Sequence, residues 1–205
     1  MNISKKEHWE NVFANKKENE VSWYQSIPQT SINFFVLNEI DKNAKIIDIG
    51  GGDSYLIDNL IELGYTNLYL LDISENAINR IKNRLGDNAE KVTFIVSDIL
   101  DFVPQVTFDV WHDRASFHFI TEINEVENYQ KLVTNSVSEN GFLFIGTFSE
   151  NGPIKCSGLE ITQYSDAKFT RIFGVNFNKI NCFTENHLTP FETIQNFIFC
   201  TFKKK

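Results

Sequence analysis

Residues 45–54 constrain the fold of this chain more than any other segment. They read Lys-Ile-Ile-Asp-Ile-Gly-Gly-Gly-Asp-Ser, an apolar run that ends in three consecutive glycines. Such a run predicts a buried strand that turns sharply into the start of a helix. A second apolar run, Leu70-Leu71-Asp72, ends in a carboxylate 20 residues after Gly52. This spacing is typical of two neighbouring strands that hold the two ends of one nucleoside-containing ligand.

Length, charge and hydropathy exclude several classes of protein. The chain has 205 residues, enough for one domain with a sizeable core. Its net charge of -8 argues against nucleic-acid binding, which needs a basic surface. No apolar run approaches the length of a membrane span, so we expect no membrane partner. Residues 1–6 lead into polar sequence without the apolar core of a signal peptide, which predicts a cytoplasmic location.

The cysteines indicate neither a covalent framework nor a metal centre. Cys156, Cys182 and Cys200 are odd in number and widely spaced, and no two form a CxxC pair. This pattern predicts neither a disulfide framework nor a zinc site. We therefore expect no bound metal.

Strand-like and helix-like segments alternate along the chain, which predicts a mostly parallel sheet covered on both faces. The expected helices lie near 4–17, 29–40, 54–63, 75–85, 123–138 and 165–173. The expected strands lie near 45–49, 67–71, 91–96, 107–112 and 141–148. The last of these should begin after a turn at Asn140-Gly141. Two final β-rich runs, 175–184 and 193–202, predict an antiparallel pair at the sheet edge.

Two classes of ligand use a glycine turn between a strand and a helix. Dinucleotides place a pyrophosphate there and favour G-x-G-x-x-G, but Tyr55 stands at the third glycine position. Asp53 would also repel the pyrophosphate. S-adenosylmethionine carries a sulfonium and an ammonium group and meets no such repulsion. The turn therefore favours S-adenosylmethionine, with a dinucleotide-dependent dehydrogenase as the alternative.

Three motifs together resemble the class I S-adenosylmethionine-dependent methyltransferases. They are Asp48-Ile49-Gly50-Gly51-Gly52-Asp53, Asp72-Ile73-Ser74 and Ser97-Asp98-Ile99. Three more segments are similar to a group of bacterial methyltransferase-domain proteins without a settled substrate: Val21-Ser22-Trp23-Tyr24-Gln25, residues 113–119 and Cys156-Ser157-Gly158-Leu159.

The resemblance implies an α/β fold for the chain. The fold would be a Rossmann-like, doubly wound sheet of seven strands, mostly parallel with an antiparallel C-terminal hairpin. It also implies a single methyltransferase domain over 1–205. Within that domain, 1–43 would form an N-terminal helical extension and lid, 44–148 the cofactor-binding core, and 149–205 the substrate-side segment and hairpin.

The same resemblance assigns the methionine end of the cofactor to the first motif. Asp48 and the turn made by Gly50, Gly51 and Gly52 would contact it. Backbone N–H groups in a glycine turn can approach a ligand closely because no Cβ intervenes. The plainer alternative is that Asp48 only bonds to the glycine loop.

The resemblance assigns the adenosine end of the cofactor to the second and third motifs. Asp72 would accept hydrogen bonds from both ribose hydroxyls, since a carboxylate has two acceptor oxygens. Ile73 would pack on the adenine. Asp98 would accept from the adenine amino group, with Ile99 beside it. In the structural alternatives, Asp72 caps the helix that begins at Ser74 and Asp98 is an ordinary turn residue.

The acceptor site is expected at the end of the fourth strand, because ligands of open α/β sheets lie beyond the carboxyl ends of the strands. The residues there are Trp111, His112, Asp113 and Arg114, followed by Phe117 and His118. We expect Asp113 or His118 to orient or deprotonate the acceptor. The alternative is an Asp113–Arg114 structural ion pair with His118 packed in the core.

Further candidates lie outside these motifs. Trp23 and Tyr24 are expected to form a lid over the cofactor, and Gln25 to bind its carboxylate. Cys156, Tyr164 and His187 follow the fifth strand, and one hypothesis makes them a site for a soft acceptor such as a thiol or a metalloid.

The sequence therefore predicts methyl transfer from S-adenosylmethionine to a small-molecule acceptor by in-line displacement, with S-adenosylhomocysteine as product. A protein (lysine) methyltransferase is one alternative, although the Asn/Asp-Pro-Pro-Tyr/Phe motif of many amino-group methylators is absent after the fourth strand. A non-catalytic S-adenosylmethionine-binding protein is the other.

Overall fold

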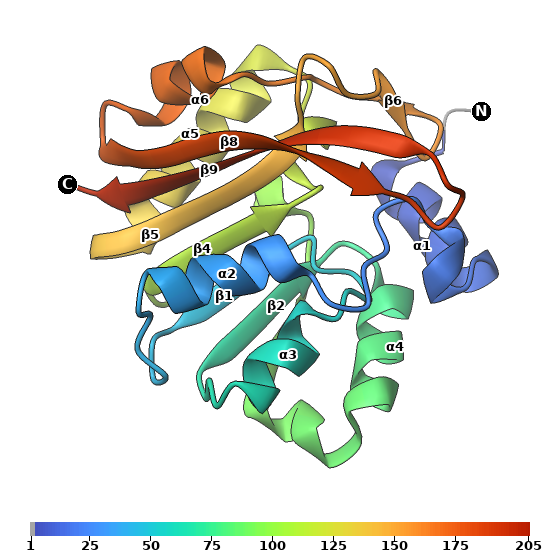
Figure 1. The fold of residues 1–205 in the computed structure, drawn as a ribbon. Helices are drawn as coiled ribbons and strands as arrows, with labels where there is room; N and C mark the ends of the chain where they lie inside the picture. The colour runs from blue at the N-terminus through green and yellow to red at the C-terminus, as the bar shows by residue number, and fades with distance from the viewer. Residues whose placement is uncertain (1–2) are drawn as a thin grey trace. The chain divides into compact units, whose positions relative to one another are not determined.

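The computed structural model describes residues 3–205 (Figure 1). The cytoplasmic location is predicted from residues 1–6. Of these, Met1 and Asn2 lie outside the described residues. The chain forms two compact units that meet in sequence between Phe102 and Val103. Its main sheet has seven strands in the order β3-β2-β1-β4-β5-β9-β8. Within the described part of the chain, no helix is long and apolar enough to cross a bilayer.

The first unit alternates helices and short parallel strands. Its elements are α1 (Lys5–Asn15), η1 (Glu18–Glu20), α2 (Gln29–Leu37), β1 (Ile46–Ile49), α3 (Leu56–Glu62), β2 (Leu68–Asp72), α4 (Glu75–Leu85), η2 (Gly86–Lys91), β3 (Val92–Val96) and η3 (Ile99–Asp101). Strand β2 pairs in parallel with β1 on one side and with β3 on the other. All four residues of β1 are buried, as the apolar run predicted.

Local signals account for the ends of these helices. At the start of α1 the Ser4 side chain accepts a hydrogen bond from the Glu7 amide, and the Glu7 carboxylate accepts one from the Ser4 amide. Helix α4 ends at Gly86, whose φ of 55° lies in the left-handed region.

The second unit holds the remaining strands. Its elements are β4 (Phe108–Arg114), η4 (Phe117–Phe119), α5 (Ile123–Ser136), β5 (Val137–Phe148), β6 (Lys155–Cys156), β7 (Leu159–Glu160), α6 (Asp166–Phe173), β8 (Phe177–Leu188) and β9 (Ile194–Lys204). Strand β5 is parallel to β4, whereas β9 is antiparallel to both β5 and β8. The predicted mostly parallel sheet with an antiparallel C-terminal hairpin is confirmed.

Strand β5 begins earlier than the sequence predicted. The turn expected at Asn140-Gly141 lies inside the strand, where Asn140 has a φ of 62°. The pairing with β4 shifts register there, because Phe108 pairs with Val137 whereas Val110 pairs with Phe142. A turn-forming pair is therefore absorbed as an irregularity in one long strand rather than separating a helix from a strand.

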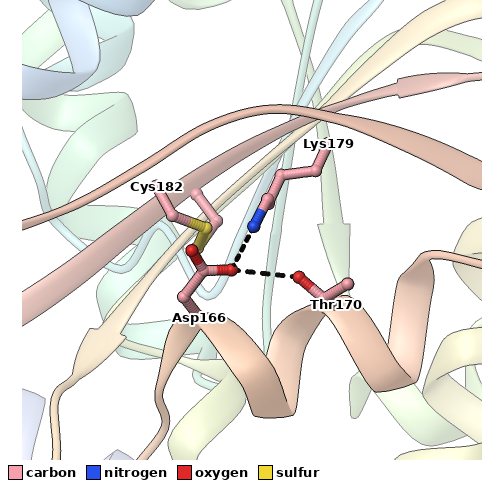
Figure 2. Close-up of a disulfide and its surroundings, with 5 residues drawn as sticks. Asp166, Thr170, Lys179 and Cys182 are labelled. Atoms are coloured by element: carbon pink, nitrogen blue, oxygen red, sulfur yellow. Dashed lines mark hydrogen bonds and ion pairs between the residues drawn. A yellow bond between two sulfur atoms is a disulfide. The ribbon is translucent and has the colours of Figure 1, made fainter.

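A disulfide joins the two C-terminal strands, which corrects the expectation from the cysteine count (Figure 2). Cys182 of β8 and Cys200 of β9 are direct partners in the antiparallel register, and their Cα atoms are 4.2 Å apart. Spacing along the sequence could not reveal this pair, because their opposition depends on the hairpin register. Figure 2 also shows Asp166, at the start of α6, accepting hydrogen bonds from Lys179 and Thr170.

Candidate functional site

The turn after β1 is built in a way that only glycine permits. Gly52 has a φ of 53°, and the Gly50 amide donates to the Leu71 carbonyl at 2.8 Å. A Cβ on Gly51 would lie 2.6 Å from the Asp48 Oδ2 atom. Asp48 is buried, so its carboxylate lies directly against the turn backbone. The first motif thus forms one tightly packed unit.

Asp72 connects this turn to the end of β2. Its Oδ2 atom accepts a 2.8 Å hydrogen bond from the Gly52 amide, and its Oδ1 atom accepts one of 2.8 Å from the Ser74 amide. The cap of α4 is the Ser74 side chain, which accepts from the Ala77 amide. Asp72 is therefore not the helix cap that the structural alternative made it, but it accepts a hydrogen bond from the amide of the residue that is. Each carboxylate oxygen can still accept a further hydrogen bond.

Burial dominates the electrostatics of Asp72. Burial, with smaller contributions from the negative charges of Asp53 and Asp48, raises the pKa of this carboxyl to about 7 against the lowering effect of its two backbone hydrogen bonds. Asp53 is also buried, and burial raises its pKa despite an ion pair of 3.0 Å with Arg80. Three buried acids therefore surround the glycine turn, an environment that suits a cationic ligand better than a pyrophosphate.

Asp98 follows β3 by two residues and lies at the same edge of the sheet, because β1, β2 and β3 are adjacent and parallel. Its Oδ1 atom accepts a 3.0 Å hydrogen bond from the Leu100 amide, which is the turn role considered above. Ile73 and Ile99 are half-buried. The structure thus brings the ends of the three motifs to one edge.

Sequence reasoning missed Glu10, which lies on the first turn of α4. Its carboxylate accepts hydrogen bonds from the Ser74 hydroxyl at 2.8 Å, the Glu75 amide at 2.8 Å and the Asn76 amide at 3.0 Å. Burial acts to raise its pKa, but these bonds outweigh burial and lower it. A helix N-terminus stabilises an anion in this way. No local pattern identifies this partner 64 residues away.

Sequence reasoning also missed Arg84, which makes several hydrogen bonds to the segment after the glycine turn. Its guanidinium makes two hydrogen bonds of 2.9 Å to the Asp58 carboxylate and one of 3.1 Å to Glu18. It also donates to the carbonyl oxygens of Asp53 at 2.9 Å and Ser54 at 2.6 Å. Arg84 therefore holds the backbone between the turn and α3 in one conformation.

Tyr55, at the position of the missing third glycine, contacts the N-terminal segment. Its hydroxyl donates to Glu18 at 2.5 Å, and its ring lies 4.1 Å from the Arg84 guanidinium. The bond to Glu18, together with burial, raises the pKa of Tyr55 to about 12. The Tyr24 ring meets it edge-on at 6.1 Å. Tyr55, which argues against a dinucleotide, thus contacts Glu18 and Tyr24 of the N-terminal segment.

The expected lid residues are half-buried. Trp23 packs edge-on against Trp9 of α1, with ring centroids 5.8 Å apart. Phe13 of the same helix lies against the turn, since a Cβ on Gly52 would be 3.0 Å from its ring. The contact of Trp23 and Gln25 with a cofactor stays a prediction.

In the second unit, Asp113 is fully buried and hydrogen-bonded. Its Oδ1 atom accepts from the Phe117 amide at 3.0 Å and its Oδ2 atom from the Tyr129 hydroxyl at 2.6 Å. The Tyr129 hydroxyl in turn accepts from the Trp111 indole N–H at 3.0 Å. Asp113 therefore joins β4, η4 and α5, and its role toward an acceptor stays a prediction.

His118 is packed among aromatic rings. It is fully buried and stacks on Phe148 at 4.7 Å with an angle of 8° between the rings. Within residues 3–205 neither ring nitrogen has a hydrogen-bond partner. Burial, with a smaller contribution from the charge of Arg114, lowers the pKa of His118 to about 3, so the imidazole is neutral at neutral pH. The Arg114 guanidinium lies over the Phe197 ring at 5.5 Å.

The three residues of the soft-acceptor hypothesis are all buried in this unit. Cys156 lies in β6 and is not part of the disulfide. Tyr164 stacks on Phe169 at 4.9 Å, and His187 of β8 meets Phe197 edge-on at 6.0 Å. The contacts of the two rings are thus with the aromatic core.

The sequence also matches known proteins. A family model described as a methyltransferase domain matches residues 40–190. The eEF1A lysine and N-terminal methyltransferase of Mus musculus is 30% identical over 124 residues, which cover 58% of this chain and 17% of that protein. The chain thus spans less than a fifth of the length of this curated relative.

Two solved structures with bound S-adenosylhomocysteine share the fold. The N-methyltransferase NodS of Bradyrhizobium japonicum has a TM-score of 0.72 at 13% identity, with 97% of each chain covered. The 1,6-didemethyltoxoflavin-N1-methyltransferase of Burkholderia thailandensis, which also holds 1,6-didemethyltoxoflavin, has a TM-score of 0.67 at 16% identity, with 88% of this chain and 78% of that chain covered. With a glycine turn bonded to the acid that ends β2 and a family match over most of its length, this chain belongs to the class I S-adenosylmethionine-dependent methyltransferases.

Proposed function

We propose that the protein transfers the methyl group of S-adenosylmethionine to a small-molecule acceptor and releases S-adenosylhomocysteine. The observation that carries this proposal is the unit formed by the glycine turn and Asp72, with the Gly52 amide bonded to the carboxylate. The residues fit the cofactor because three buried acids at the turn complement a ligand that carries a sulfonium and an ammonium group. The absence of a Cβ at Gly51 lets the Asp48 carboxylate lie directly against the turn backbone.

In this proposal each motif binds one part of the cofactor. Asp48 and the glycine turn hold the methionine end. Asp72 accepts hydrogen bonds from the ribose hydroxyls through lone pairs that its bonds to backbone amides leave available. Ile73 and Ile99 pack on the adenine, and Asp98 accepts from its amino group.

The N-terminal segment completes this cofactor site in our proposal. Trp23 lies over the cofactor, and Gln25 binds its carboxylate. The half-buried state of both side chains and the packing of Trp23 on Trp9 support a position over a ligand rather than in free solvent.

When bound, the cofactor supplies a methyl group already activated by the sulfonium. The chain has to align the acceptor with the methyl carbon and sulfur and to exclude water. A base is needed only for an acceptor that carries its proton at neutral pH. A neutral His118 with a lowered pKa is a poor base, so we propose that His118 orients the acceptor and that Asp113 orients or deprotonates it.

A small-molecule acceptor is supported by the toxoflavin enzyme, which holds a small heterocycle and has a similar fold. The eEF1A methyltransferase supports the protein (lysine) alternative over part of the chain. A non-catalytic S-adenosylmethionine-binding protein is the third possibility. We further propose that both compact units belong to one methyltransferase domain, with residues 1–43, 44–148 and 149–205 as extension, core and substrate-side segment.

One labelling experiment separates these possibilities. The protein is incubated with methyl-labelled S-adenosylmethionine and an extract of small metabolites, and in parallel with an extract of proteins. Label in metabolites is the expected result. Label in protein supports the alternative, and tight cofactor binding without transfer supports a non-catalytic role. In the same assay we expect Asp113→Asn to bind the cofactor and to lose turnover, and unchanged turnover would remove Asp113 from the mechanism.

A further inference from the structure

The N-terminal segment from Ser4 to Gln25 is attached to the helices that follow the glycine turn at separate points. Helix α1 lies beside α4 (Figure 1). The first attachment is Glu10, whose carboxylate accepts three hydrogen bonds from residues 74–76. Helix α4 begins three residues after Asp72, so this attachment borders the proposed ribose site.

The second attachment follows α1. The Lys16 carbonyl accepts a 2.5 Å hydrogen bond from Arg80, the residue that also pairs with Asp53. The Glu18 carboxylate then binds both Arg84 at 3.1 Å and the Tyr55 hydroxyl at 2.5 Å. Residues that follow the glycine turn in the sequence therefore bind the N-terminal segment at this second attachment.

Phe13 lies between the two attachments. Its ring is buried against the turn, 3.0 Å from the position of a Cβ on Gly52. Glu10 and Glu18 hold the chain on either side of Phe13, so the stretch that carries this ring is fixed at both ends.

The ion pair at the second attachment is partly exposed to solvent. Glu18 and Arg84 retain 32% and 16% side-chain exposure, so solvent screens their attraction. Salt weakens such partly exposed pairs. Hydrogen bonds between charged side chains and backbone amides can break and re-form without unfolding the sheet.

We propose that residues 4–25 form a clasped strap over the cofactor site, and that Glu10 and Glu18 are the clasps whose opening limits cofactor entry and exit. The proposal rests on the proposed cofactor site. A variant that favours opening of the strap by the same factor in the free and the bound protein raises the association and dissociation rates by that factor and leaves Kd unchanged. A residue that only contacts the cofactor would change the dissociation rate and Kd together.

The test measures binding of S-adenosylhomocysteine to wild type, Glu10→Gln and Glu18→Gln. Calorimetry gives Kd, and displacement of labelled ligand by excess unlabelled ligand gives the dissociation rate. We expect each variant to raise both rates about five-fold or more, with Kd within about two-fold of wild type. The matched controls are Glu7→Gln and Glu20→Gln, whose carboxylates bond, among residues 3–205, to Ser4 and Lys17 of the strap itself.

Wild type supplies a second measurement that needs no variant. Raising the salt from about 0.1 M to about 1 M should speed dissociation in wild type and less so in the Glu10→Gln/Glu18→Gln double variant. Unchanged rates in both single variants would refute the strap. So would a rise in the dissociation rate matched by a rise in Kd, or a wild-type dissociation rate that does not change with salt concentration. A wild type that binds neither form of the cofactor refutes the proposed function itself, and the strap's role with it.

Discussion

The Gly52 amide donates a 2.8 Å hydrogen bond to the Asp72 carboxylate, across 20 residues of sequence. This bond joins the turn after β1 to the end of β2. The two features that the sequence offered as separate motifs are therefore one structural unit. Any change at Asp72 alters both the shape of the turn and the acceptor oxygens next to it.

Asp72→Ala should weaken S-adenosylmethionine binding by about 1–3 kcal/mol, because ribose hydroxyls lose their acceptor and the Gly52 amide is left unbonded. Calorimetry measures the affinity, and thermal unfolding checks that the variant is folded. Asp87→Ala, at an exposed position in η2, is the control and should bind like wild type. Equal affinity in Asp72→Ala would overturn the ribose assignment.

Cofactor affinity should fall as the pH drops through about 7, the pKa to which burial raises Asp72. Hydroxyl donors favour the ionised carboxylate, so binding to the protonated form must expel a proton. Well below that pKa the affinity should fall by about ten-fold per pH unit. Calorimetry in two buffers of different ionisation enthalpy should detect the proton released near pH 6. A pH-independent affinity between about pH 5.5 and 8 would exclude Asp72 as the ionising contact.

Gly51→Ala should abolish tight cofactor binding and destabilise the protein by about 1–3 kcal/mol. The new Cβ would lie 2.6 Å from Asp48 Oδ2 and 3.0 Å from a Leu70 methyl group, and both neighbours are buried. Urea unfolding and calorimetry measure the two effects. Ser54→Ala, three residues on, is the control and should change stability by less than about 0.5 kcal/mol.

Tyr129→Phe should lower the free energy of unfolding by about 2 kcal/mol or more. The change removes the donor to Asp113 and the acceptor of the Trp111 indole N–H, and all three side chains are buried. Urea unfolding measures the loss. A difference below about 0.5 kcal/mol would mean that this network does not stabilise the second unit.

Reduction of the Cys182–Cys200 disulfide should lower the free energy of unfolding by about 3 kcal/mol, the value typical of a closed loop of this size. Unfolding with and without a reductant measures the effect. Cys182→Ser should already be destabilised and should not respond to the reductant. Cys156→Ser retains the pair and should respond like wild type. A wild type insensitive to reduction would show that this disulfide does not contribute to stability.

Much of the fold was predictable because its signals are local. The apolar run before Gly50 predicts β1, the Ser4 and Glu7 pair predicts the start of α1, and Gly86 predicts the end of α4. At Asn140-Gly141 a local turn signal was outweighed, because pairing with β4 and β9 extends β5 through it.

The contacts that assemble the candidate site were less predictable. The sequence marks Tyr55 as incompatible with a third glycine, but its bond to Glu18 spans 37 residues. Glu10 resembles any acid on the polar face of a helix until α4 places its N-terminus against it. Cys182 and Cys200 become partners only through the register of β8 and β9.

The sequence by itself determined the elements, the glycine turn and the acids near the carboxyl ends of the three strands, because backbone preferences and hydrophobic periodicity act over a few residues. Only the tertiary structure decided which groups those acids bind, how residues 4–25 attach to the turn, and which cysteines pair. These contacts join residues that are far apart in the chain. Their geometry exists only once the strands have paired and the helices have packed.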